Sequence, residues 1–169
     1  MKKFVSGLLV ASYLALSVCA LQPAQAASAT GSATAEIVSP ICLMGVNGGV
    51  LKFGQIVPGT GGTICVAPDN SRHNSNGVQV VSTSSFAAAQ FQVNGAANAA
   101  ISIAIPQTLT INNGVNSMLV DGLTSMPYGT GMLDANGRCN IFVGGTLHVR
   151  PNQALGVYSG NFTITVAYN

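Results

Sequence analysis

Charged residues are scarce in this chain of 169 residues, which has six lysines and arginines, four aspartates and glutamates, and no tryptophan. So few cations exclude the basic surface that nucleic acid and anionic lipid require, and we expect no nucleic-acid partner. Little charge also means little self-repulsion, which suits a subunit that packs against copies of itself. A poorly charged secreted domain with a surface of Ser, Thr and Asn fits the same count.

Groups that perform catalysis or bind metals are also few. The two histidines, His73 and His148, have no cysteine or second histidine at the spacing of metal ligands. The carboxylates Asp69, Asp121 and Asp134 are isolated in expected loops, where Asp usually stabilises turns. We therefore expect no enzymatic activity: no catalytic residues, no cofactor, no metal and no small-molecule substrate.

The first 26 residues have the pattern of a secretory signal peptide. Two lysines precede an apolar run over residues 4–21, and Ala24, Gln25 and Ala26 form an Ala-x-Ala site, so cleavage is expected after Ala26. A lipoprotein box ending at Cys19 is a weaker alternative, because a valine precedes the cysteine. Removal of residues 1–26 leaves 143 residues with four basic and four acidic side chains, which is the size of one exported domain.

The rest of the sequence favours an all-β fold. Charged helix formers are few, and short apolar runs alternate with turns rich in Gly, Asn and Ser. About ten short strands at this spacing predict an antiparallel β-sandwich. The expected strands are residues 36–43, 50–57, 63–66, 78–81, 90–93, 100–105, 109–111, 118–123, 139–143, 146–150 and 158–168. Residues 68–77 and 125–137 are expected to be loops.

The stretch 158–168 has the clearest strand pattern. Its even positions from Phe162 onward are apolar or aromatic and its odd positions are polar, so one face is built to be buried. Gly156 is the fourteenth residue from the end and Tyr168 the second. This spacing resembles the C-terminal signature of pilins that are assembled by a periplasmic chaperone and an outer-membrane usher.

The segment 27–37 also alternates, but with small residues. Its odd positions are apolar or glycine, and its even positions are Ser, Thr or Glu. Side chains with so few methylenes bury little, at roughly 0.8 kcal/mol for each CH₂, so such a strand needs a groove supplied by something else. The inward-facing residues would be Ala29, Gly31, Ala33, Ala35 and Ile37. The alternative is a disordered leader or linker.

Three cysteines remain after removal of the signal peptide: Cys42, Cys65 and Cys139. The apolar residues on either side of Cys42 and of Cys65 are expected to face the core, so both cysteines face outward. Cys139 shares its parity with later core positions and is expected to be a buried thiol. Because exported cysteines are usually oxidised, we predict a disulfide between Cys42 and Cys65.

Several segments together resemble the bacterial domain-of-unknown-function family 4402. They are residues 51–59, 61–63, 91–95, 103–106, 143–147 and 165–169, with Gln153, Gly156, Tyr158, Gly160 and Phe162. The resemblance covers nearly the whole chain after the signal peptide. It implies a pilin-like, immunoglobulin-like sandwich and a role as a fimbrial subunit. The three cysteines depart from the pattern expected of this family.

The resemblance to pilins implies a mode of assembly. Such subunits lack one strand of the sandwich, and an N-terminal extension of the neighbouring subunit fills the open groove. Residues 27–37 would be the donor strand, and the domain would span residues 38–169. One groove wall would contain Gly156, Tyr158, Phe162, Ile164, Val166 and Tyr168.

The function expected from the sequence is that of a structural subunit of a surface fimbria for cell adhesion. Its partners would be copies of itself or related pilins, a periplasmic chaperone and an usher. It would pass through the periplasm to the cell surface. The alternative is a self-complete secreted sandwich that binds a glycan or a host protein through residues 68–77 and 125–137.

Overall fold

The computed structural model describes residues 27–169. The chain divides into two units, and the second comprises Glu36–Asn169. Residues 27–40 have no regular secondary structure and are exposed. The predicted signal peptide, residues 1–26, lies outside the described residues. Within the described part, no helix has the length and apolar character needed to cross a membrane.

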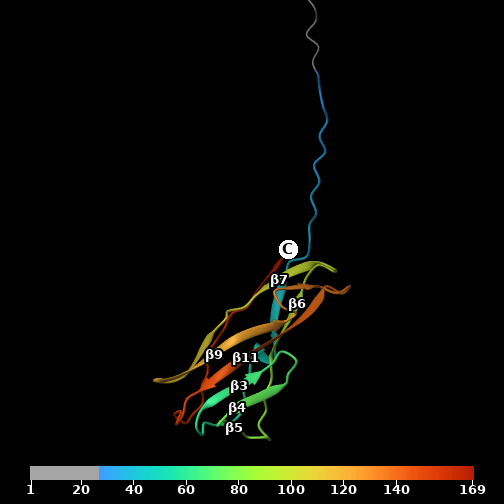
Figure 1. Cartoon of the computed structure of the whole chain (residues 1–169). Coiled ribbons are helices and arrows are strands. Elements are labelled where there is room, and N and C mark those ends of the chain that lie inside the picture. Colours follow the sequence, from blue (N-terminus) through green and yellow to red (C-terminus); the bar gives the residue numbers. More distant parts are fainter. Residues whose placement is uncertain (1–26) are drawn as a thin grey trace, which may run out of the picture. The chain divides into compact units, whose positions relative to one another are not determined.

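The domain is all-β, as predicted from the sequence. Figure 1 shows its strands folded into antiparallel sheets. In chain order the elements are β1 (Cys42–Val46), the short 3-10 helix η1 (Asn47–Gly49), β2 (Ile56–Val57), β3 (Gly62–Val66), β4 (Arg72–Asn76), β5 (Gln79–Val80), β6 (Ala89–Asn94), β7 (Ala100–Ala104), β8 (Leu109–Asn113), β9 (Asn116–Met126), β10 (Thr130–Met132), β11 (Arg138–Val149) and β12 (Thr165–Tyr168).

The larger sheet is organised around β11. Along one edge, β11 pairs with β6 and then with β3, and along the other edge it pairs with β9. β1 extends the sheet beyond β6, β4 extends it beyond β3, and β8 pairs with β9. Two smaller sheets, β10-β7-β12 and β2-β5, complete the described strands. Their side chains share one hydrophobic core, as in a sandwich-like fold.

Alternation along β9 and β11 supplies much of that core. Val120, Leu123, Ile141, Val143 and Leu147 are all buried, and the residues between them are more exposed except Gly144 and Gly145, which are buried. An antiparallel strand with one buried face has this period of two. These two core strands therefore show their buried face as an apolar pattern in the sequence.

Two expected strands, 139–143 and 146–150, are one continuous strand, β11. Gly144 and Gly145 lie inside it and form no turn. A side chain at Gly144 would collide with the carbonyl oxygen of Val66 on β3, and the register with β9 shifts between Gly144 and Thr146. These glycines permit close backbone approach at a bulge, which is a frequent reason for glycine inside a strand.

The ends of the chain differ from the predicted strands. The first strand begins at Cys42 and not at residue 36, and the last regular strand begins at Thr165 and not at residue 158. β12 pairs with β7, and Figure 1 shows the C-terminus beside β7. Residues 157–164 have no regular secondary structure apart from one isolated bridge, between Asn112 and Ser159. This stretch borders the candidate site.

Candidate functional site: an open groove beside the C-terminal segment

One wall of the groove is the segment 153–162. Ser159 and Asn112 exchange two main-chain hydrogen bonds, of 2.8 and 3.0 Å. In extended chain, the peptide groups of successive residues point to opposite edges. The N–H and C=O groups of Tyr158 and Gly160 therefore point away from β8, and within the described residues they form no main-chain hydrogen bond.

The opposite wall is the segment 48–56. Lys52 and Ala87 exchange main-chain hydrogen bonds of 2.8 and 3.0 Å, so this segment is also held along one edge only. Leu51 has no main-chain hydrogen bond among the described residues. Two walls with unpaired peptide groups therefore face each other across the groove, and such edges readily accept an added strand.

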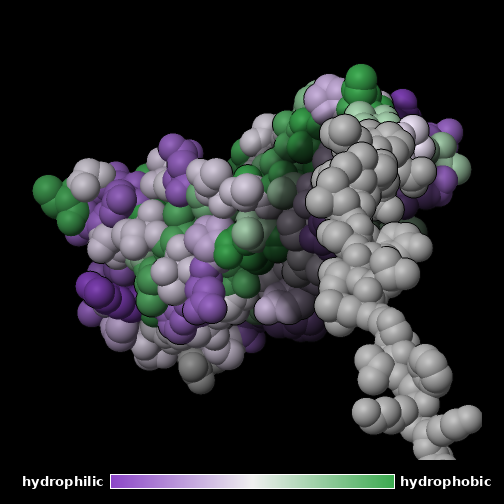
Figure 2. Space-filling view, turned by 90° about the horizontal axis from the view of Figure 1, so that it is seen from above, coloured by the Kyte–Doolittle hydropathy of each residue, from purple (hydrophilic) through white to green (hydrophobic). Residues whose placement is uncertain are grey.

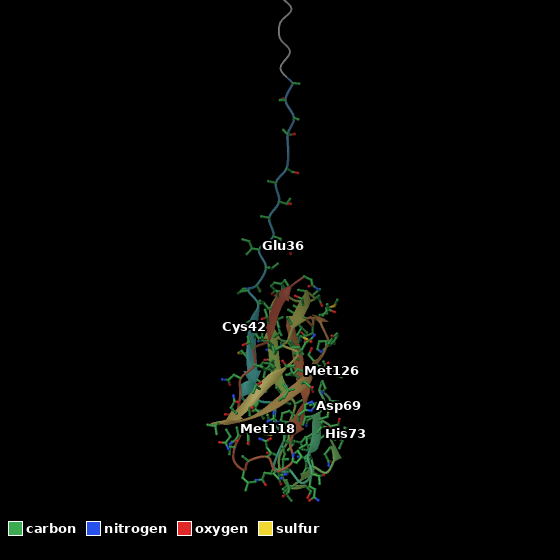
Figure 3. The ribbon with its side chains drawn as sticks, turned by 60° about the vertical axis from the view of Figure 1, so that its left-hand side comes forward. Glu36, Cys42, Asp69, His73, Met118 and Met126 are labelled. Atoms are coloured by element: carbon green, nitrogen blue, oxygen red, sulfur yellow. The ribbon has the colours of Figure 1, made fainter. Side chains whose placement is uncertain are left out.

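The groove has a volume of about 1140 Å³ and an apolar floor. The floor side chains come from β6, β8, β9 and β11 and belong to the core or pack against it. They are Phe91, Leu109, Ile111, Met118, Leu147 and Val149. Figure 3 labels Met118 on its strand within the domain. A bound segment could therefore bury apolar side chains on the floor while its main chain pairs with the walls.

The predicted wall residues divide into two groups. Gly156, Tyr158 and Phe162 line the groove. Ile164 is a core residue with 7% exposure, while Val166 and Tyr168 lie on β12 and pack against the core. The groove therefore lies beside the first half of the predicted strand, and the second half is paired with β7.

Close contacts with β8 explain why the wall has glycine at positions 156 and 160. Gly156 has a φ of 139°, and a side chain there would collide with the amide group of Asn113. A side chain at Gly160 would collide with the main-chain oxygen of Thr110 on β8. Both glycines let the wall lie close to β8, which fixes one side of the groove.

Aromatic and polar contacts hold the wall in place. The rings of Phe91 and Phe162 meet edge to face, with centroids 6.0 Å apart and an interplanar angle of 81°. Such pairs contribute roughly 0.5–1.5 kcal/mol beyond area burial. The Tyr158 hydroxyl donates to the Ala154 carbonyl oxygen (2.8 Å) and accepts from Gln153 Nε2 (2.9 Å). The wall is therefore ordered without a partner strand.

The predicted donor residues are exposed. Ala29, Gly31, Ala33 and Ala35 lie in the stretch 27–40, all of which is solvent-exposed, and Ile37 has 98% exposure. An isoleucine with so much of its surface in water gains nothing from its own fold, since burial of such a side chain is worth about 1.5–3 kcal/mol.

The predicted disulfide between Cys42 and Cys65 is not formed, and all three described cysteines are free. Both cysteines face outward as expected, but they lie far apart along β11. Cys42 is level with Arg138 through the pairing of β1 with β6 and of β6 with β11, and Cys65 pairs with Thr146, eight residues further on. Cys65 pairs with His73, and Figure 3 shows Cys42 and His73 in different parts of the domain. Parity along each strand indicated which face a cysteine occupies but could not indicate where its strand pairs along β11.

Cys139 is half-buried and packs against the core. Burial raises the pKa of its thiol above 9.0, and the negative charge of Asp134 adds to this effect. A thiol with a raised pKa is a weak nucleophile at neutral pH. Cys139 therefore has the character of a structural cysteine.

Residues 27–169 contain no cluster of three or more potential metal ligands. His148 Nε2 lies 2.8 Å from Asp121 Oδ1, a contact between β11 and β9 on a part-exposed face. Neither residue lines the groove, although the neighbours of His148 on β11, Leu147 and Val149, belong to the floor. An exposed pair of this kind contributes about 0–1 kcal/mol to folding.

Sequence reasoning missed the second wall and the floor. Residues 50–57 were predicted to form a strand without a role, and Phe91 was not connected to Phe162. The sequence feature that could have indicated this wall is the pair of glycines before residue 50. The structure explains one of them, because a side chain at Gly49 would collide with the Phe91 ring. The close approach of Gly49 to Phe91 places the wall 48–56 directly against the floor of the groove.

A family model described as a domain of unknown function (DUF4402) matches residues 45–168. Both groove walls and the whole floor lie within the matched range. Comparisons with curated proteins and with solved structures found no match.

Proposed function

The chain belongs to the DUF4402 family of unknown function, and we propose that it is a structural subunit of a surface fimbria joined by donor-strand exchange. The observation that carries this proposal is the groove of about 1140 Å³, which has unpaired peptide groups along both walls and an apolar floor. A sandwich with such a slot is completed by one added strand. Strand addition supplies affinity through main-chain hydrogen bonds and specificity through alternate side chains.

The proposed occupant is the segment 27–37 of a second copy. Its eleven residues correspond in length to the wall 153–162, which has ten. Its alternation places Ala29, Gly31, Ala33, Ala35 and Ile37 toward the floor and its hydroxyl side chains toward solvent. A net gain of about 0.5–1.5 kcal/mol for each main-chain hydrogen bond would add up along two edges, although the small side chains bury little surface.

Export and assembly follow from the same proposal. Cleavage after Ala26 would make residue 27 the new N-terminus, free to enter a neighbour. Before assembly, an open apolar groove is an aggregation hazard, so a periplasmic chaperone would cover it and an outer-membrane usher would mediate the exchange. The alternative of a self-complete sandwich requires a closed edge, and the unpaired walls weigh against it.

The direct test is co-expression with a chaperone and usher of the full chain or of a chain that lacks residues 27–37. We expect the full chain to form heat-resistant polymers on gels and the deletion to form none. Equal polymer yield from the deleted chain would overturn the proposal. Folding of both proteins is checked by circular dichroism, since the segment contributes no described strand.

A matched pair of substitutions makes the test sharper. Ala33→Asp would place a charge on the apolar floor, whereas Thr34→Asp would place it in solvent. We expect the first to abolish polymers and the second to leave them nearly unchanged, because an unpaired buried charge is very costly. Equal effects would show that the segment is not a strand with one buried face.

A further inference from the structure

Two exposed apolar side chains, Leu155 and Val157, line one end of the groove, and a third, Val115, lies in the turn that follows the neighbouring strand β8. Leu155 and Val157 have exposures of 86% and 87%, and Val115, in the β8–β9 turn, has 99%. Asn113, at the end of β8, links the β8–β9 turn to the segment that contains Leu155, since its Nδ2 donates to the Leu155 carbonyl oxygen at 3.2 Å. Figure 2 shows that hydrophobic residues reach the surface of the domain in patches between hydrophilic ones. We call Val115, Leu155 and Val157 the rim cluster.

The two ends of the groove differ in the room that they offer. At the Phe162 end, Phe162 contacts Phe91 edge to face, and Gly49 lies against the Phe91 ring. Large side chains have little space there. At the Leu155 end, the wall residues are largely exposed. The groove therefore favours a strand that is small at one end and bulky at the other.

The segment 27–37 has this gradient. Its first inward residues, Ala29 and Gly31, are small, and its last, Ile37, is large. Val38, the next residue, has 51% exposure. Ser39 is already held to the domain, because its carbonyl oxygen accepts a hydrogen bond of 2.8 Å from the Tyr168 hydroxyl. Only Val38 separates Ile37 from this anchor, so whatever receives Ile37 also lies close to the donor's domain.

We propose that the rim cluster is an interface between copies of this chain, and that it receives Ile37 and Val38 of the neighbouring copy. This inference rests on the proposed function. The donor strand then runs antiparallel to the wall 156–162, with Ala29 near Phe162 and Ile37 near Leu155. The interface covers five apolar side chains that are otherwise in water, three on one copy and two on the other.

A donor strand that runs in the opposite direction, parallel to the wall 156–162, would bury different residues and would come from a different chain. A strand parallel to the wall would place Ile37 at the crowded Phe162 end and leave the rim cluster in water. It is also the direction that a chain's own extension would take. Ser39 is anchored at Tyr168, beyond the Phe162 end, so a self-inserted segment would enter the groove from there. Strand direction thus distinguishes a neighbour's segment from the chain's own.

Engineered cysteine pairs measure this direction. In a background with Cys42, Cys65 and Cys139 replaced by serine, we compare Ile37→Cys with Leu155→Cys against Ile37→Cys with Thr163→Cys. After assembly and oxidation, we expect covalent multimers from the first pair only. Multimers from the second pair, or a covalent link within a single chain, would overturn the proposed interface.

These outcomes separate the two proposals. Polymers linked through residue 163 would leave donor-strand exchange intact and refute the rim interface. If the full chain with its natural cysteines forms no polymers, both proposals fail. Polymer formation by the serine background is verified first by its gel ladder, so a missing cross-link reports on geometry.

A second measurement needs no cross-link. Leu155→Asp should make polymers dissociate on heating about tenfold faster, because a charge replaces a buried side chain. Met132→Asp is the matched control, since Met132 is an exposed apolar residue (67%) on β10, outside the groove lining. Equal dissociation rates for the two variants would overturn the interface.

Discussion

The Tyr168 hydroxyl donates a hydrogen bond of 2.8 Å to the carbonyl oxygen of Ser39, which lies 129 positions earlier in the chain. The same hydroxyl accepts a hydrogen bond of 2.7 Å from the main-chain N–H of Ala96. Gly95 makes room for it, because a side chain there would collide with the phenol. The second residue from the end therefore fixes the point where the N-terminal extension leaves the domain.

Replacement of Tyr168 by phenylalanine tests this anchor. The ring still packs against the core, but the Ser39 carbonyl and the Ala96 N–H lose their partner. We expect the free energy of unfolding in urea to fall by about 1–3 kcal/mol. Tyr128→Phe is the control: Tyr128 is 78% exposed, and its change should stay within about 0.5 kcal/mol. Equal losses would show that the hydroxyl bonds of Tyr168 contribute nothing.

Gly160→Ala should displace the groove wall. The new methyl group would overlap with the Thr110 carbonyl oxygen, and backbone atoms on both sides cannot move as a flexible side chain can. We expect a loss of about 1–3 kcal/mol in the free energy of unfolding, which is typical of overpacking. The exposed neighbour Asn161 provides the control, and Asn161→Ala should have little effect. A neutral Gly160→Ala would mean that the wall is not held against β8.

The strong core strands were predictable because burial leaves a period of two in the sequence. β9 and β11 show it, and the all-β fold follows from such strands and the turns between them. β4 was missed, because its sequence Arg-His-Asn-Ser-Asn has no apolar residue and was interpreted as a loop. It is a strand because β3 pairs with it, and Thr63 and Ser75 join their hydroxyl groups across the pair. Tertiary pairing overrides local preference at such an edge.

The groove was only half predictable for a related reason. Alternation identified the wall that contains Tyr158 and Phe162, since that signal is local. The opposite wall, near Lys52, is distant in sequence, and nothing local relates the two segments. Likewise, the outward orientation of Cys42 and Cys65 was readable, but the distance between their positions along β11 was not. Strand order depends on long-range contacts, which a single sequence does not display.

Asp134→Asn should make the Cys139 thiol more reactive. The Asp134 charge is the second cause of the raised thiol pKa, after burial. Asparagine keeps an oxygen for the N–H groups of Asn136 and Arg138, each 2.8 Å from Oδ1. We expect faster alkylation of Cys139 by iodoacetamide at pH 8, followed by mass spectrometry of each cysteine. The rate for exposed Cys42 should not change. An unchanged rate at Cys139 would exclude an influence of Asp134.

Cys139 should also make stability fall at alkaline pH. Because its folded-state pKa is raised above 9.0, its contribution is fully present below pH 9 and is lost as pH rises through the folded value. Urea unfolding between pH 8 and 10.5 should therefore show a smaller decline for Cys139→Ser than for the natural chain. Cys42→Ser serves as the control, since Cys42 is exposed. Parallel declines in all three proteins would refute the effect.

Ser71→Ala should raise the pKa of Asp69 toward its usual value of 3.8. The Ser71 hydroxyl donates to Asp69 Oδ1 at 2.7 Å and is the main cause of the lowered pKa, with the Ser71 N–H at 2.9 Å as the second. A lowered pKa stabilises the fold above pH 3.8, and this effect is lost as pH falls through the folded value. An NMR titration of the carboxylate measures the shift. Ser82→Ala, at an exposed position, should leave it unchanged.

The cysteines give the last prediction. The positions of Cys42 and Cys65 lie eight residues apart along β11, level with Arg138 and Thr146, and a disulfide requires Cα atoms within about 7 Å. At roughly 3.3 Å for each residue of a strand, a separation of eight residues far exceeds this limit. The purified monomer, unfolded without reductant and treated with a thiol label, should therefore carry a label at Cys42, Cys65 and Cys139. The same sample with reductant gives the reference for complete labelling. Labelling of Cys139 alone before reduction would show that Cys42 and Cys65 are joined, and that the positions of β1 and β3 along the sheet are wrong.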